Sequence, residues 1–133
     1  MKRPDMYRRF AVFLALATAG CATQPAARPT AFAVFFQPYS VGLDQAALAT
    51  IAGAAKAAKA APNDHIMLVG AADNTGSSDG NRSLSQARAE AVLSALVWDG
   101  VDRTRLHAEG RGESGQLFDM TQSDRRVIIK LED

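Results

Sequence analysis

The sequence predicts an α/β (α+β) fold, a two-layer sandwich in which two helices cover one face of a mixed four-stranded sheet. Two helical patterns alternate with short apolar runs, and the chain ends on two strand patterns, which gives the order β-α-β-α-β-β. Right-handed crossovers between neighbouring strands place both helices on the same face. With 133 residues, of which 47% are hydrophobic, the chain suffices for one domain with one core.

The first strand and the first helix are predicted from local composition. Ala31–Gln37 is rich in Phe and Val, as strands commonly are. Asp44 is a suitable N-cap for an Ala-rich helix over Gln45–Ala60, because its carboxylate can accept hydrogen bonds from the first helical N–H groups. Pro62 stops that helix. Its apolar stripe is predicted to contain Leu48, Ile51 and Ala55.

The central strand and the second helix follow along the chain. Ile66–Gly70 is a continuous apolar run, which is typical of a strand buried on both faces. After a polar turn, a helix is expected to begin at Asn81 and to end near Trp98. Ser83 and Gln86 have the spacing of a capping box at the start of this helix.

The C-terminal third contains two further strand patterns. Arg105–Glu109 predicts a weaker strand, Gly110–Ser123 a polar loop, and Arg126–Leu131 the last strand. The loop opens on Gly-Arg-Gly-Glu-Ser-Gly, which formally matches the dinucleotide-binding pattern G-x-G-x-x-G. Because no helical pattern follows to receive a pyrophosphate, we interpret it as a Gly-rich turn.

Residues 1–20 have the composition of a targeting signal. A basic leader precedes the uncharged run Phe10–Gly20, which is too short to span a bilayer as a helix. Leu16–Cys21 resembles the bacterial lipoprotein signal, which implies that Cys21 is lipidated and becomes the mature N-terminus. Ala22 in place of Asp after the cysteine implies sorting to the outer membrane, with the domain on its periplasmic face. The alternative is an ordinary signal peptide with an incidental thiol.

Residues 21–30 then form a short linker and residues 31–133 the domain. The formal net charge is +1, with its positive excess in the leader, which argues against a nucleic-acid binder. No metal or cofactor site is expected, because His65 and His107 stand at edges of predicted strands, away from other ligand-type residues. No serine has a credible base and orienting acid, so we expect a protein that is not an enzyme.

An arginine on the apolar face of the second helix is the most informative feature of the sequence. At 100° per residue, Arg88 falls among Leu84, Ala91 and Ala95. A buried guanidinium needs an anion, and Asp73, which follows the preceding strand, is the candidate. Such a pair suits a zwitterion, whose ammonium contacts the carboxylate and whose carboxylate is held by the guanidinium fork. A structural salt bridge that closes the loop onto the helix is the alternative, and spacing alone leaves both open.

The residues around this pair resemble a known family. Gly70–Ser77, Asn81 and Leu84–Ala89 are similar to the central signature of OmpA-like peptidoglycan-binding domains. Further matching elements follow in the same order at Gly100-Val101, Gly110–Glu113 and Asp124–Val127. The resemblance covers Phe32–Leu131 and implies the sheet of that family, with strand order 1-4-2-3 and the last strand antiparallel.

The resemblance also implies a ligand and a role for each site residue. The ligand is the diaminopimelate of the peptidoglycan stem peptide, whose ammonium would meet Asp73 and whose carboxylate would meet Arg88. Asn81 would help to order the loop, and Arg125 would line the pocket. Together with a lipidated Cys21, this predicts an outer-membrane lipoprotein that tethers the envelope to the cell wall.

Three positions at the rim of the expected pocket differ from the family pattern. Tyr39 stands where an acid or an amide is usual, Ala71 where a histidine or tyrosine is usual, and Gly80 where an aromatic is usual. These changes remove side-chain contacts and predict weaker binding or a shifted ligand preference. A second hypothesis is therefore a lipoprotein of the same fold whose wall site has decayed, acting as a protein–protein interaction module in an envelope complex.

Overall fold

The computed structural model describes residues 27–73, 76–113 and 125–133, and its elements follow the predicted order. They are β1 (Ala31–Phe35), α1 (Gln45–Ala60), β2 (His65–Ala72), α2 (Ser78–Trp98), β3 (Leu106–Glu113) and β4 (Arg126–Glu132), with a short 3₁₀ helix at Arg103–Arg105. The predicted signal, residues 1–20, and Cys21 lie outside the described residues. Within those residues, no helix is both long enough and apolar enough to cross a membrane.

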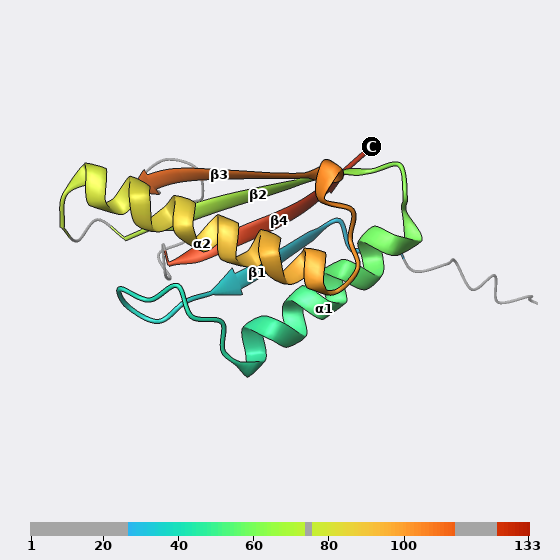
Figure 1. The fold of residues 1–133 in the computed structure, drawn as a ribbon, viewed down its shortest axis with the longest axis horizontal. Coiled ribbons are helices and arrows are strands. Elements are labelled where there is room, and N and C mark those ends of the chain that lie inside the picture. The colour runs from blue at the N-terminus through green and yellow to red at the C-terminus, as the bar shows by residue number, and fades with distance from the viewer. Residues whose placement is uncertain (1–26, 74–75, 114–124) are drawn as a thin grey trace, which may run out of the picture.

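The four strands form one mixed sheet in the order β1-β4-β2-β3. β2 pairs in parallel with β3, while β4 lies between β1 and β2 and is antiparallel to both. The two helices lie on the same face of this sheet, with α2 packed mainly on β2 and β3 and α1 packed on β1 (Figure 1). The predicted two-layer fold and strand order are therefore confirmed.

The core lies between the sheet and the helices. In the register of β2 with β4, Ile66 pairs with Leu131 and Leu68 with Ile129, and all four side chains are buried. Because side chains alternate along a strand, these residues share the face that the helices cover. The helices contribute Ile51, Val92 and Leu96 to the same core.

The first helix packs on the sheet through small side chains. Asp44 caps it as predicted, with Oδ1 accepting a hydrogen bond from the Ala47 N–H at 2.8 Å. The predicted stripe is wrong at Leu48, which is 50% exposed, and right at Ile51 and Ala55, which are buried. The buried face consists of Ala47, Ile51, Ala54, Ala55, Ala57 and Ala58. This alanine face lets α1 lie close to the sheet and leaves the larger Leu48 at its margin.

The second helix begins at Ser78 and not at Asn81. Ser77 is its N-cap, and its Oγ accepts a hydrogen bond from the Gly80 N–H at 3.1 Å. The predicted capping box at Ser83 is therefore wrong, because an equally good acceptor six residues earlier already satisfies the helix start. The helix ends at Trp98 as predicted. Its buried face consists of Asn81, Ser85, Arg88, Ala89, Val92, Leu93 and Leu96.

Strand β3 is longer than predicted, and glycines in the sheet let α2 approach its backbone. The predicted loop at Gly110–Ser123 is wrong where it overlaps β3, and its remainder lies outside the described residues. A Cβ atom on Gly110 would overlap the backbone of Gln86, and one on Gly70 would overlap the carbonyl of Ser85. These glycines bring α2 against both parallel strands.

The described N-terminal segment and Asp73 lie at opposite ends of the sheet. The Leu131 N–H donates to the Thr30 carbonyl at 2.8 Å, and Arg28 forms an ion pair with Asp64 at 2.9 Å, both beside the start of β2. Asp73 directly follows the other end of that strand. Eight residues of β2 separate the two ends by about 25 Å.

Candidate functional site

The ends of two paired strands bring Asp73 and Arg125 together. Asp73 follows β2, and Arg125 directly precedes β4, the antiparallel neighbour of β2. Arg125 Nη1 lies 3.3 Å from Asp73 Oδ2, and the two side chains are 34% and 28% exposed. The ends of the two central strands therefore carry a partly exposed ion pair, with one negative and one positive group side by side.

Arg88 is close to this pair, and its side chain is fully buried. Its guanidinium donates hydrogen bonds to three backbone carbonyls, from Nε to Ser40 at 2.9 Å, from Nη2 to Gln37 at 3.1 Å and from Nη1 to Ala71 at 3.4 Å. The ring of Phe36 lies 5.2 Å from its Cζ atom. Oxygen dipoles and an aromatic face thus surround the buried cation.

The charges around Arg88 act on it in opposite directions. Burial lowers the pKa of its guanidinium, the carboxylate of Asp73 raises it, and the positive charge of Arg125 lowers it. The guanidinium stays protonated at neutral pH, as arginines in proteins do. The prediction that Arg88 lies on the buried face of its helix is confirmed, while its contact with a ligand stays a prediction. The spacing of residues along the sequence did not indicate that backbone carbonyls, as well as an anion, would surround the buried guanidinium of Arg88.

Asn81 joins the first turn of α2 to the end of β3. Its side chain is buried, and its Nδ2 donates to Glu113 Oε1 at 3.2 Å. The hydroxyl of Ser78 donates to the same oxygen at 3.5 Å. A Cβ atom placed on Gly76 would lie 3.8 Å from the Asn81 Oδ1. Asn81 thus stands next to the loop that it was predicted to order, and residues 74–75 of that loop lie outside the described part.

Two polar residues of α2 that the sequence did not indicate as site residues hold this helix on β3. The Oγ of Ser85 accepts a hydrogen bond from the Gly112 N–H at 2.8 Å. The Oε1 of Gln86 accepts one from the Gly110 N–H at 2.6 Å. These bonds set the position of α2 and so of Arg88. The two glycines were the signal available in the sequence, but only the paired structure shows what approaches them.

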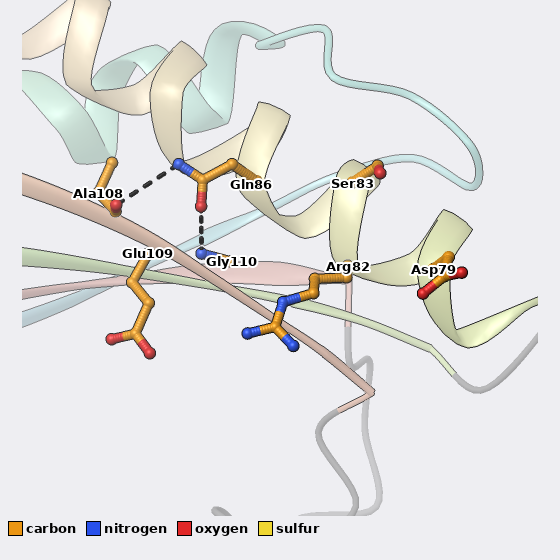
Figure 2. Close-up of a pocket in the computed structure, with 7 residues that line it drawn as sticks. All are labelled: Asp79, Arg82, Ser83, Gln86, Ala108, Glu109 and Gly110. Carbon is orange, nitrogen blue, oxygen red and sulfur yellow. Dashed lines mark hydrogen bonds between the residues drawn. The ribbon is translucent and has the colours of Figure 1, made fainter.

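A shallow groove of about 520 Å³ runs along the contact between α2 and β3. Figure 2 shows the amide of Gln86 bridging from the helix to Ala108 and Gly110, with the side chains of Arg82 and Glu109 extending beyond the strand. Because its central amide already bonds the backbone of β3, we regard this groove as a helix–strand contact and assign no ligand to it.

The three altered rim positions have different environments. Tyr39 is 79% exposed, whereas Ala71 is buried and its carbonyl is one of the acceptors for Arg88. Gly80 lies in the first turn of α2, where its N–H donates to the Ser77 side chain. Of these residues, Tyr39 offers the largest side-chain surface to solvent.

Histidines and acidic residues do not gather into a metal site in the part of the chain that the structure describes. No group of three or more His, Cys, Asp or Glu side chains there is placed to hold a metal ion. His65 and His107 lie with their ring centroids 6.5 Å apart and their planes tilted by 45°.

Comparisons with known sequences agree with this fold. The model of the OmpA family matches residues 35–129. The chain is 35% identical over 103 residues to the probable lipoprotein YiaD of Escherichia coli (strain K12), a match that covers 74% of this chain and 47% of YiaD. It is 38% identical over 72 residues to outer membrane porin F of Pseudomonas fluorescens, covering 53% of this chain and 22% of the porin. The chain thus spans less than half the length of these curated relatives.

Solved structures show the same architecture. The peptidoglycan-associated lipoprotein from Burkholderia pseudomallei matches with a TM-score of 0.64 and 28% identity, covering 76% of this chain and 88% of that one. The OmpA-like domain of FopA1 from Francisella tularensis matches with a TM-score of 0.68 and 20% identity, covering 77% and 73%. At that lower identity, the second likeness concerns the fold alone.

Proposed function

Because the chain belongs to the OmpA family, we propose that it binds peptidoglycan and catalyses no reaction. The proposed ligand is the diaminopimelate of the stem peptide, whose free end carries an ammonium and a carboxylate. The observation that supports this most directly is the partly exposed pair of Asp73 and Arg125. Charged groups of both signs at one end of the sheet match a zwitterion, and charge-assisted hydrogen bonds are the strong ones.

The ion pair can exchange partners with such a ligand without leaving a charge unpaired. In the proposed complex, the ammonium contacts Asp73 while the ligand carboxylate contacts Arg125, so each side chain keeps an opposite charge beside it. Arg88 adds positive charge next to the pocket. The predicted contact of Arg88 with the ligand carboxylate also belongs to this proposal. It would use N–H groups of the guanidinium beyond the three that donate to backbone carbonyls. Asn81 keeps the first turn of α2 and the adjoining loop in place.

We further propose that a lipid on Cys21 anchors the protein in the outer membrane, with the domain in the periplasm. Two similar proteins are described as lipoproteins, YiaD as a probable one and the Burkholderia protein as peptidoglycan-associated. The described chain enters the domain at the end opposite Asp73. Of the predicted linker over residues 21–30, the part before Arg28 reaches about 25 Å when extended, because Arg28 and Thr30 are bonded to the domain. A domain held at that end would turn its site away from the membrane and toward the wall.

Co-sedimentation with purified sacculi tests the proposed site. The detergent-solubilised protein should sediment with sacculi, and Asp73→Ala and Arg125→Ala should each weaken binding by about 10- to 100-fold, the value of a lost charged hydrogen bond. Asp79→Ala and Arg111→Ala are matched controls, because they remove exposed charges of the same sign elsewhere. Both controls should bind like the wild type.

The same experiment separates the two hypotheses. Equal sedimentation of the wild type and all four variants would place binding outside this site. Absence of binding by a wild type with a normal melting curve would favour the second hypothesis, a protein–protein interaction module in an envelope complex.

A further inference from the structure

A tight turn beside the site holds an exposed tyrosine in a backbone conformation that favours glycine. The Ser40 N–H donates to the Gln37 carbonyl at 3.2 Å, which closes a turn with Pro38 and Tyr39 at its centre. Tyr39 has φ of +54° and is 79% exposed. A proline followed by a residue with positive φ is the pattern of a type II turn, whose third position normally takes Gly or Asn.

Arg88 fixes this turn to the strand that leads to Asp73. Its Nη2 and Nε donate to the carbonyls of Gln37 and Ser40 at 3.1 and 2.9 Å, so one guanidinium holds both ends of the turn. Its Nη1 donates to the carbonyl of Ala71, two residues before Asp73. Because Arg88 is fully buried, these bonds keep the turn at a set place relative to the carboxylate.

The turn is also attached to the strand that carries the cation. The Phe36 N–H, one residue before the turn, donates to the Arg125 carbonyl at 2.9 Å. The turn that carries Tyr39 is therefore linked to the backbone near both members of the ion pair. Arg88 links it to Ala71, near Asp73, and Phe36 links it to Arg125.

The fold gains little from a tyrosine at this place. Its ring lies mostly in solvent, and its backbone has a conformation that costs energy for any residue with a Cβ atom. Glycine would fit the turn without loss of core packing. Backbone strain retained at an exposed residue beside a binding site is a reason to look for a functional contact.

We propose that Tyr39 contacts the ligand and selects diaminopimelate within a peptidoglycan fragment over the free diamino acid. This inference rests on the function proposed above. Asp73 and Arg125 would recognise the charged end that both ligands share. The flat, rigid ring of Tyr39 adds a contact for the C–H surface of the adjoining stem-peptide and sugar groups, which only the fragment has.

Calorimetric titration of the detergent-solubilised full chain with two probes tests this proposal. The probes are free meso-diaminopimelate and a soluble disaccharide–tripeptide that contains it. Tyr39→Gly should weaken fragment binding about three- to tenfold, the value of one aromatic contact, and leave binding of free diaminopimelate unchanged. Tyr39→Phe keeps the ring and should preserve fragment binding.

Val41→Gly is the matched control. Val41 is 44% exposed just beyond the turn, and φ is not positive there. This variant should keep both affinities and lower the melting temperature, whereas Tyr39→Gly should not lower it. If Tyr39→Gly changes the affinity for both probes alike, or for neither, the role of Tyr39 is overturned and the proposed function stands. A wild type that binds neither probe overturns both proposals.

Discussion

At the scale of single residues, the buried guanidinium of Arg88 balances two opposing free-energy terms. Taking a cation out of water costs several kcal/mol, and this cost must be offset by the groups around it. Here the carbonyls of Gln37, Ser40 and Ala71 accept its hydrogen bonds, and the carboxylate of Asp73 favours its charged form. The same bonds hold the loop after β1 against the end of β2, so the cation supports the shape of the site.

We expect Arg88→Met to lower the free energy of unfolding by about 2–4 kcal/mol, because carbonyls that receive charged donors lose them. Methionine fills similar space without a charge, which keeps the cavity contribution small. Urea denaturation followed by circular dichroism measures the change. Arg111→Met, at an exposed position of β3, is the control and should stay within about 0.5 kcal/mol of the wild type. Equal effects of the two variants would contradict the structural role of Arg88.

The free-energy cost of the Tyr39 conformation is smaller than the cost of burying Arg88. It is partly offset because tyrosine loses less chain entropy on folding than glycine does. A residue with a Cβ atom pays about 1–2 kcal/mol for the left-handed region, while glycine pays about 0.5–1 kcal/mol in extra chain entropy on folding. The strain relieved exceeds the added entropy cost by about 0–1.5 kcal/mol, so replacing Tyr39 by glycine should leave stability equal to that of the wild type or above it. A matched replacement at Val41 lacks the compensating gain and should destabilise. The strain at Tyr39 is measured by the difference between the stability changes that the two glycine substitutions cause, and not by either change alone.

At the scale of elements, the approach of α2 to the parallel strands depends on missing side chains. We expect Gly110→Ala to destabilise the protein by about 3 kcal/mol, because the added methyl group overlaps the backbone of Gln86. Since α2 carries Arg88, displacement of the helix should also weaken binding to sacculi. Thermal unfolding and the sedimentation assay measure the two effects.

Gly53→Ala is a control with the opposite expected sign. Gly53 lies within α1, and a Cβ atom there would make an ordinary contact, 3.8 Å from the Phe32 ring. Alanine in a helix interior should therefore stabilise the protein by about 0.5–1 kcal/mol. If Gly110→Ala proves as stable as the wild type, the close contact of α2 with β3 is wrong.

At the scale of the whole molecule, local patterns predict the elements better than they predict their contacts. Helix and strand periodicity depend on neighbouring residues, so the order of elements is predicted correctly. The start of α2 is missed because Ser77 and Ser83 are both acceptable caps, and the length of β3 is missed because glycines are poor strand formers. The ion pair of Asp73 with Arg125 joins residues 52 positions apart, which spacing along one helix or strand cannot indicate.

The point where the chain enters the domain and the candidate site lie at opposite ends of the sheet. The chain enters at the start of β2, where Arg28 pairs with Asp64, and the site lies at the other end of that strand. Figure 1 shows α2 ending on the entry side, and Trp98 is its last residue. The carbonyl of the next residue, Asp99, accepts a hydrogen bond at 2.9 Å from Lys59 in the last turn of α1. The proposed ligand binding and the proposed lipid anchoring should therefore act on separate ends of the domain.

The single tryptophan of the chain makes this separation measurable. Trp98 is 89% exposed and lies at the entry end, so saturation with a peptidoglycan fragment should leave its fluorescence emission unchanged. In a Trp98→Phe chain that also carries Tyr39→Trp, the tryptophan stands where the ligand contact is proposed, and the same fragment should shift or quench its emission because contact excludes water from the ring. An equal response from both positions would mean that the ligand reaches the entry end, and the assignment of binding to the Asp73 end of the sheet would then be wrong.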